Sequence, residues 1–256
     1  MPFPQPTDDL SAAADDLDRH GYCLVADALD HDALEHLRRA TSAEAQADRT
    51  ADVAHVYSRE RSQRVWCLPR RGDVFVRLAC HPTALALAAH VLDDDVLLSN
   101  LSANIVGPGG DEMVPHSDQE WAPRPWPHPL AMHVLWMIDA FTAENGATLL
   151  MPGSHRCPHT DVRWAPVAAE GPAGTALAFD ARVLHGTGAN RSRLGRMGIL
   201  AYYCRGFVRQ QENFARSLSP DAIAEWPEDL RSLFGFTFHP EYLGMVNGPP
   251  SELPRY

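Results

Sequence analysis

The pattern of residues along the chain changes near residue 95, and this change constrains its fold more than any other feature. From there to about residue 210, short apolar and β-branched runs are separated by turns rich in glycine and proline, such as GPGG (107–110) and GPAG (171–174). Short apolar runs separated by such turns are typical of β-strands. Helical patterns followed by many short strands predict an α+β domain, mainly β, built on a double-sheet jelly roll with flanking N-terminal helices.

Apolar residues at helical spacing define the expected helices, one ending at Gly21 and another beginning with a proline. These helices are Leu10–His20, His31–Asp48, Pro82–Leu92 and a closing helix over Ser219–Leu233. The expected strands are Tyr22–Val25, Val96–Val106, Met132–Phe141, Thr148–Met151, Thr175–Asp180, Arg182–His185 and Met197–Cys204. We therefore expect one domain over 1–256, with a helical part at about 8–92, a jelly-roll core at about 95–210, and a C-terminal helix and tail over 215–256.

Composition excludes several classes of protein. A net charge of −11 argues against nucleic acid as a partner, because a nucleic-acid-binding face is basic. The apolar stretches are too short to span a bilayer, and the N-terminus lacks the apolar core of a signal peptide. Five scattered cysteines without a CxxC pair are typical of reduced thiols. We expect a cytoplasmic protein with no membrane or nucleic-acid partner, and its oligomeric state stays open.

Two histidines and an aspartate form a candidate metal site. His116 and Asp118 would project from one face of a strand, because side chains alternate with period 2. His185 follows 67 residues after Asp118 and would reach the site from a later strand. A 2-His-1-carboxylate set leaves one face of an octahedral metal open, as in non-haem Fe(II) oxygenases. Arg196, eleven residues past His185, offers a fixed fork for the carboxylate of an acid cosubstrate.

Three longer segments carry a resemblance to a known family. PHSDQEW (115–121), ENGATLLMPGSH (144–155) and LHGTGANRSRLGR (184–196) resemble the phytanoyl-CoA dioxygenase family of Fe(II)/2-oxoglutarate oxygenases, and the likeness covers roughly residues 95–215. It implies a cupin-like double-stranded β-helix with iron held by His116, Asp118 and His185. It also implies Fe(II), 2-oxoglutarate and O2 as cofactors. The expected reaction hydroxylates, desaturates or epoxidises a small molecule as 2-oxoglutarate is decarboxylated to succinate.

The resemblance also implies a site for the cosubstrate. Arg196 would bind the distal carboxylate of 2-oxoglutarate, assisted by the hydroxyl of Thr187. Thr148 is a further candidate hydroxyl donor. Asn104 is a candidate for the other end of the cosubstrate, although ordinary hydrogen bonding within a strand explains it equally well.

Four nearby residues have ordinary interpretations. Arg191 and Arg193 lie in a turn-like segment and are expected to face solvent. His155 belongs to the PGSH loop and is expected to be a structural donor. His133 is expected to face away from the metal.

The substrate candidates are Trp121, Trp136 and Arg64. The tryptophans could wall an apolar pocket, although a tryptophan on a barrel strand more often belongs to the core. Arg64 lies in segment 58–77, which holds six arginines. It is a candidate to bind a substrate carboxylate, whereas a solvated face is the commoner role of such a charge run.

Two other functions fit the same residues. A non-catalytic cupin-like protein could bind a metal or ligand between the same sheets, although it would need neither an open metal face nor a buried arginine. A metal-dependent hydrolase or isomerase could use the same three ligands. Nothing in the chain indicates an acyl-CoA substrate, since it is acidic and lacks a phosphate-binding loop. We therefore expect a free small acid or a secondary metabolite.

Overall fold

A computed structural model describes residues 3–157, 165–239 and 243–248, and its centre is a seven-stranded sheet facing a smaller one. The strands of the large sheet are β1 (Tyr22–Val25), β2 (His55–Tyr57), β3 (Ser62–Val65), β4 (Val96–Val106), β5 (Ala131–Met137), β8 (Ala176–Asp180) and β10 (Arg196–Arg205). The small sheet holds β6 (Thr148–Leu150), β7 (Val167–Ala168) and β9 (His185–Thr187). The strand orders are β1-β8-β5-β10-β4-β3-β2 and β7-β6-β9, and neighbouring strands are antiparallel.

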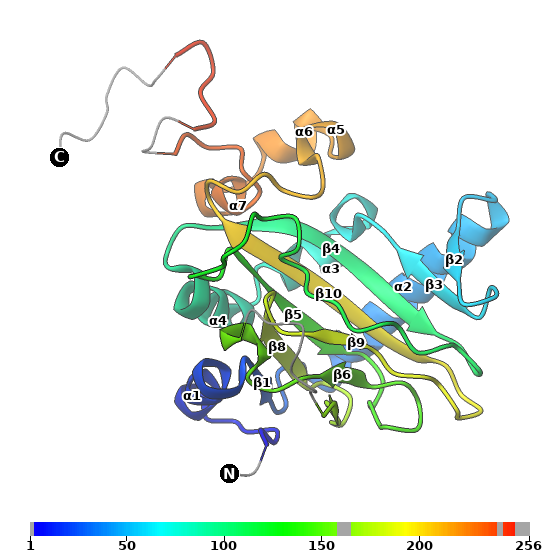
Figure 1. Cartoon of the computed structure of the whole chain (residues 1–256). Helices are drawn as coiled ribbons and strands as arrows, with labels where there is room; N and C mark the ends of the chain where they lie inside the picture. The colour runs from blue at the N-terminus through cyan, green and yellow to red at the C-terminus, as the bar shows by residue number, and fades with distance from the viewer. Residues whose placement is uncertain (1–2, 158–164, 240–242, 249–256) are drawn as a thin grey trace.

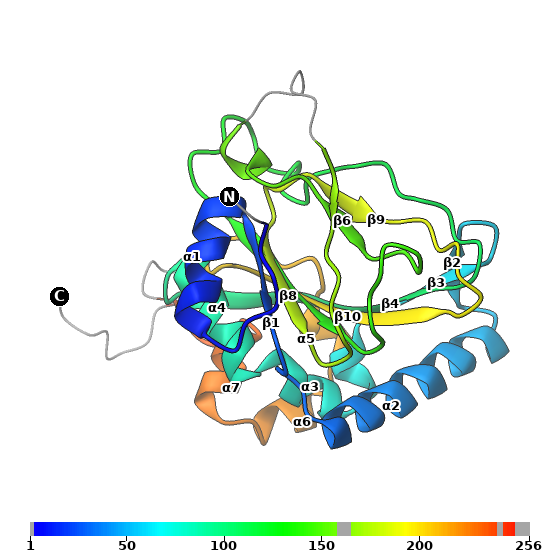
Figure 2. The same ribbon diagram turned by 90° about the horizontal axis from the view of Figure 1, so that it is seen from below.

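Helices cover the face of the large sheet that points away from the small one (Figure 1, Figure 2). They are α1 (Leu10–His20), α2 (His31–Thr50), α3 (Asp73–Ala79), α4 (Pro82–Leu92), α5 (Phe214–Ser217), α6 (Pro220–Ala224) and α7 (Glu228–Leu233), with short 3-10 turns at Leu68–Arg71 and Ser154–Arg156. The expected fold class is therefore confirmed: flanking helices support a double-sheet β-structure of the cupin-like kind.

Local signals set the ends of several helices. The Asp9 carboxylate accepts hydrogen bonds from the first turn of α1, and Gly21 ends that helix with a φ of 83°, so the predicted bounds are correct. The prediction of one closing helix is wrong, because α6 and α7 are separate elements. Pro227 precedes α7 and lacks the backbone N–H that a continuous helix would require.

The strands near the site also differ from their predicted bounds. β9 begins at His185, whereas the sequence predicted a strand ending there, and β5 stops at Met137. The hairpin of β2 and β3 was not predicted. It extends the large sheet beside β4 and brings segment 62–65 against the site.

The large sheet separates two apolar cores. Val134 and Trp136 pack with the helices in a cluster that extends from Ala13 to Phe234. Leu135 and Met137, on the opposite face of β5, pack toward the small sheet. This alternation follows from the period of a β-strand, and it leaves the space between the two sheets for the polar side chains described below.

Within the described ranges, no single helix is long and apolar enough to cross a membrane. α3 and α4 reach the length and apolar character of a membrane span only when they are taken together, and the two helices are bent by 42° relative to each other.

Candidate metal centre and active site

The three candidate ligands meet between the two sheets. His116 and His185 form an isolated β-bridge, in which each backbone N–H donates to the other residue's carbonyl at 2.9 Å. Asp118 lies in a turn, so the expectation that 116–118 is a strand is wrong beyond this bridge. The Ser117 hydroxyl anchors the turn by donating to the Ala181 carbonyl at 2.8 Å. The pair is therefore presented by an anchored loop between β4 and β5.

The geometry of the three side chains fits a metal ion. His116 Nε2 lies 3.5 Å from Asp118 Oδ1, and His185 Nε2 lies 3.3 Å from Asp118 Oδ2. Adjacent ligand atoms of an octahedral ion with bonds near 2.1 Å lie about 3 Å apart. Each histidine directs Nδ1 to a carbonyl two residues back, at 3.0 Å in both cases, so Nδ1 carries the proton and Nε2 is free to bind a metal.

The Asp118 carboxylate is held in its charged form. Burial alone would raise its pKa, but contacts with His116, His133 and His185 outweigh burial and hold the pKa well below its ordinary value. The Asp118 contact in turn raises the pKa of His116. A charged carboxylate among imidazoles is the electrostatic state that a divalent cation requires.

His133 lies beside the site, so the expectation that it faces away from the metal is wrong. Its Nε2 lies 2.6 Å from Asp118 Oδ2, and its ring is stacked between Phe179 and Tyr202 at centroid distances of 4.9 and 4.3 Å. Nδ1 is buried without a hydrogen-bond partner, and burial lowers the pKa of this histidine. The neutral tautomer with its proton on Nε2 satisfies both observations, so His133 donates to Asp118 Oδ2.

Arg196 is sealed within the structure at 1% exposure. Its Nε and Nη2 donate to the Gly146 carbonyl at 3.0 and 2.6 Å, and its guanidinium carbon lies 4.2 Å from the Phe141 ring centre. Nη1 is buried without a partner. Burial lowers the pKa of Arg196 to about 10. One donor of the fork therefore remains available to a ligand, which is the arrangement expected for a carboxylate site.

Thr148 and Thr187 are direct partners across β6 and β9, and both line the cavity that contains the three candidate ligands. They are 5% and 9% exposed. Asn104 lines the same cavity; its Nδ2 donates to the Thr187 hydroxyl at 3.4 Å and its Oδ1 accepts from Tyr57. The structure thus places Thr148, Thr187 and Asn104 on the wall of one cavity, whereas Arg196 does not line it, and Asn104 is already engaged in local hydrogen bonds.

The substrate candidates separate into three cases. Trp136 faces the helices at 0% exposure, with His81 4.7 Å from its ring centre, so its assignment to the substrate wall is wrong. Trp121 is 48% exposed and does not line the cavity, but its Nε1 donates to Tyr202 at 3.2 Å. Arg64 does line the cavity, so the solvated interpretation is wrong for it.

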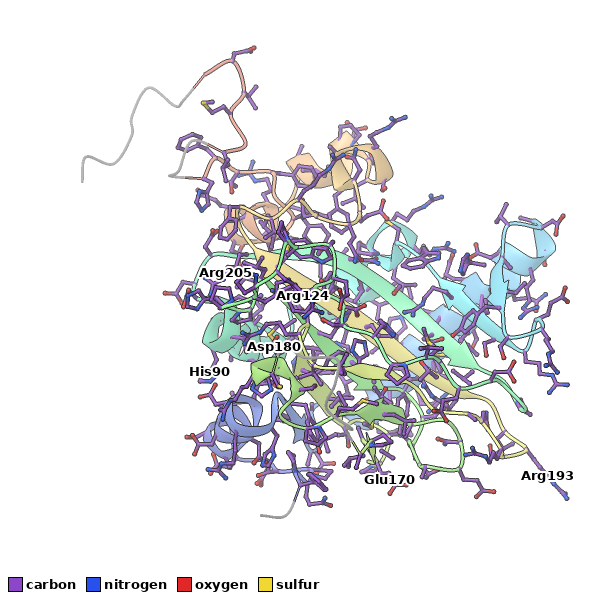
Figure 3. All side chains as sticks on the ribbon, viewed as in Figure 1. His90, Arg124, Glu170, Asp180, Arg193 and Arg205 are labelled. Carbon is purple, nitrogen blue, oxygen red and sulfur yellow. The ribbon has the colours of Figure 1, made fainter. Side chains whose placement is uncertain are left out.

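The ordinary interpretations hold for the two exposed arginines, whereas the role of His155 as a structural donor stays a prediction. Arg191 and Arg193 are exposed, and Figure 3 shows Arg193 pointing away from the body of the protein. His155 lies outside the metal cavity, with its Nδ1 buried near Gly21.

Sequence reasoning missed the polar side chains along β4. Asn100 and Ser102 precede Asn104 at a spacing of two, and all three line the cavity. Polar residues at every second position of a predicted strand were the available signal, since such residues share one face. Tyr202 was also missed; its hydroxyl donates to the Asp118 carbonyl at 2.9 Å and supports the metal loop.

Together, the fold and the site define a class: double-stranded β-helix proteins with a His, Asp and His cluster suited to one metal ion. The family model described as phytanoyl-CoA dioxygenase (PhyH) matches residues 17–198. The chain therefore belongs to the phytanoyl-CoA dioxygenase family.

Similar proteins agree with this assignment. A protein named Dioxygenase af480 from Aspergillus fumigatus is 33% identical over 205 residues, which cover 74% of this chain and 65% of that protein. EctD from S. alaskensis, solved with bound Fe, is 25% identical with a TM-score of 0.66, over 82% of this chain and 83% of EctD. The epimerase SnoN, solved with Fe3+, alpha ketoglutarate and nogalamycin RO, shares the fold at 22% identity and a TM-score of 0.63, over 77% of this chain and 84% of SnoN. The chain spans less than two thirds of the first curated relatives it matches, at 65% and 40% of their lengths.

Proposed function

We propose that this protein is an Fe(II)- and 2-oxoglutarate-dependent oxygenase that oxidises a small organic molecule. One observation carries the proposal: the cavity that holds the three candidate metal ligands is also lined by Thr148 and Thr187. Arg196 lies on the same face of β10 as the lining residues Leu200 and Tyr202, and its buried Nη1 has no hydrogen-bond partner. Arg196 itself does not line the cavity, but a cation site with a buried arginine on the adjoining part of β10 matches the two parts of this cofactor pair.

In this proposal His116, Asp118 and His185 hold the iron. The two imidazoles offer Nε2 and the aspartate offers a carboxylate oxygen, a donor set that suits Fe(II) with open positions on one side. When bound, Fe(II) with 2-oxoglutarate supplies the oxidising power for the substrate, as 2-oxoglutarate is converted with O2 to succinate and CO2. His133 holds the second carboxylate oxygen and keeps Asp118 oriented.

The cosubstrate is bound by Arg196, Thr187 and Thr148. The guanidinium would neutralise the distal carboxylate of 2-oxoglutarate, and the paired hydroxyls would complete its hydrogen bonds. The arginine is buried with its guanidinium against the Phe141 ring, so water competes little for a bound anion. Asn104 is a secondary candidate, because its hydrogen bond to Thr187 orients that hydroxyl.

The substrate side of the proposal is a small molecule of secondary or small-acid metabolism. SnoN is described as acting in nogalamycin biosynthesis, and HygX was solved with hygromycin B, which supports a small organic substrate in this fold. All five cysteines are free, which supports a cytoplasmic location. The continuous core cluster from Ala13 to Phe234 supports a single domain.

The test is turnover of 2-oxoglutarate. Purified protein supplied with Fe(II), 2-oxoglutarate and O2 should form succinate, and the His116→Ala variant should form none. A non-catalytic cupin-like protein would bind metal without consuming 2-oxoglutarate. A hydrolase or isomerase with the same ligands would act without consuming O2. Either result would overturn the proposal.

A further inference from the structure

A polar subsite occupies one part of the cavity that holds the candidate metal ligands. Arg64, Asn100, Ser102 and Gln211 line this part, beside Trp66, which is 42% exposed and marks the rim. Arg64 is the register partner of Asn104 on β4, and its Nη1 donates to the Ser102 hydroxyl at 3.3 Å. The side chain therefore follows the polar face of β4 toward the rim and away from the sealed Arg196.

Arg64 forms no ion pair among the described residues: its guanidinium carbon lies 5.3 Å from the Trp66 ring centre, and the Asp118 carboxylate acts on it only at longer range. Three other partly buried arginines, Arg38, Arg71 and Arg182, are paired with aspartates. Arg64 forms no such pair, and Ser102 is its one hydrogen-bond partner in the described part of the chain, although a guanidinium has five N–H donors. Removing a cation from water without pairing it is unfavourable. An anion bound beside Arg64 would compensate for this.

A second polar group in the same place lacks a partner. Asn100 is 6% exposed, and its Oδ1 is buried without a hydrogen bond. Its Nδ2 donates to Gln211 Oε1 at 3.5 Å. A ligand placed here would therefore meet a guanidinium and, next to it, an acceptor suited to an N–H or O–H group.

The net charge of the site with Fe(II) and 2-oxoglutarate bound also favours an anionic ligand. Fe(II) with Asp118, Arg64 and Arg196 carries three net positive charges, and the two carboxylates of 2-oxoglutarate neutralise two of them. One positive charge then remains inside the cavity. A monoanionic substrate would neutralise it.

We propose that Arg64, with Ser102 and Asn100, forms a substrate subsite that binds the carboxylate of a small acid bearing an N–H or O–H donor. This inference rests on the proposed function. It assigns Arg64 to substrate recognition, and it distinguishes Arg64 from Arg196, which binds the cosubstrate.

The first measurement separates substrate from cosubstrate. Anaerobic protein loaded with Fe(II) is titrated with 2-oxoglutarate, and the visible charge-transfer absorption of the complex reports binding. Arg64→Gln should bind 2-oxoglutarate within about threefold of wild type, and so should Arg70→Gln, an exposed control. If Arg64→Gln weakens 2-oxoglutarate as strongly as Arg196→Gln does, Arg64 belongs to the cosubstrate site and the inference is wrong.

The second measurement tests the class of substrate. Common amino acids, their N-acetyl derivatives and hydroxybenzoic acids are each paired with the primary carboxamide, and succinate formation above the substrate-free rate is recorded. We expect at least one acid to stimulate wild type about tenfold more than its amide, and this preference to be lost in Arg64→Gln, retained in Arg70→Gln and partly retained in Arg64→Lys.

The outcomes distinguish this inference from the function it rests on. Amides that stimulate as well as their acids, or a panel in which no acid stimulates, would overturn the subsite while the absorption band and basal succinate formation persist. Wild-type protein with neither the band nor basal succinate would instead contradict the oxygenase function itself.

Discussion

The two faces of the large sheet differ in what their side chains do, and β5 shows both faces within four residues. Trp136 points to the helices and is fully buried among apolar groups. His133 points between the sheets and contacts Asp118. One face is closed and mainly apolar, whereas the other lines a cavity with polar side chains that include the three candidate metal ligands. We therefore expect substitutions on the helix face to change folding stability, and substitutions on the cavity face to change binding.

The largest effect should come from removing a metal ligand. His185→Ala deletes one of three donors. Because changes to groups that merely orient a ligand weaken metal binding by about 10- to 100-fold, loss of a donor should weaken it further. Equilibrium dialysis with Fe(II) under anaerobic conditions measures this, and His116→Ala should behave alike. The metal-free variants should unfold near the wild-type temperature; near-normal iron occupancy in either one would refute the ligand assignment.

A substitution on the helix face should lower folding stability and leave metal binding unchanged. Trp136→Ala removes a fully buried ring and should lower the free energy of unfolding by about 3–5 kcal/mol. The folded fraction should still bind Fe(II) with wild-type affinity, since Trp136 does not reach the cavity. Denaturant unfolding and metal titration give the two values, and Trp136→Phe provides a milder variant if the alanine protein is too unstable. A marked loss of iron affinity in the folded protein would contradict the separation of stability and binding between the two faces.

The third test concerns the sealed arginine. Arg196→Gln should weaken 2-oxoglutarate binding by about 2–5 kcal/mol, because it removes a charged partner from a buried carboxylate. Iron binding should stay near wild type. Thr187→Ala should show a smaller loss, and Arg191→Ala, which alters an exposed side chain, should show almost none. Equal sensitivity at positions 191 and 196 in the 2-oxoglutarate titration would contradict the assignment of Arg196 to the cosubstrate carboxylate.

The smallest expected effect concerns the orientation of Asp118. His133→Phe keeps an aromatic ring between Phe179 and Tyr202 but removes the donor to Asp118, so Fe(II) affinity should fall by about tenfold or somewhat more. His133→Gln retains an N–H donor and should recover part of the loss. Co(II) titration followed by its visible spectrum measures affinity without turnover. Unchanged affinity in His133→Phe would show that the contact does not position the carboxylate.

Some features could be predicted because their causes lie close together in the chain. The bounds of α1 follow from Asp9 and Gly21, which act on backbone groups within one turn. The order and spacing of His116, Asp118, His185 and Arg196 along the chain indicate a metal and carboxylate site without any knowledge of contacts between these segments. The spacing of Asn100, Ser102 and Asn104 along β4 is a further local signal, because residues two apart on a strand share one face.

By itself, then, the sequence determined the class of fold and the chemical types at the site. Only the tertiary structure decided which way His133, Trp136 and Arg64 point. A strand's alternation places His133 and Trp136 on opposite faces, but which face meets the cavity depends on the pairing of β5 with β8 and β10. Arg64 turns inward because β3 pairs with β4. These pairings join residues far apart in the chain, and the packing of two sheets and a helical layer selects them, which no local pattern of residues encodes.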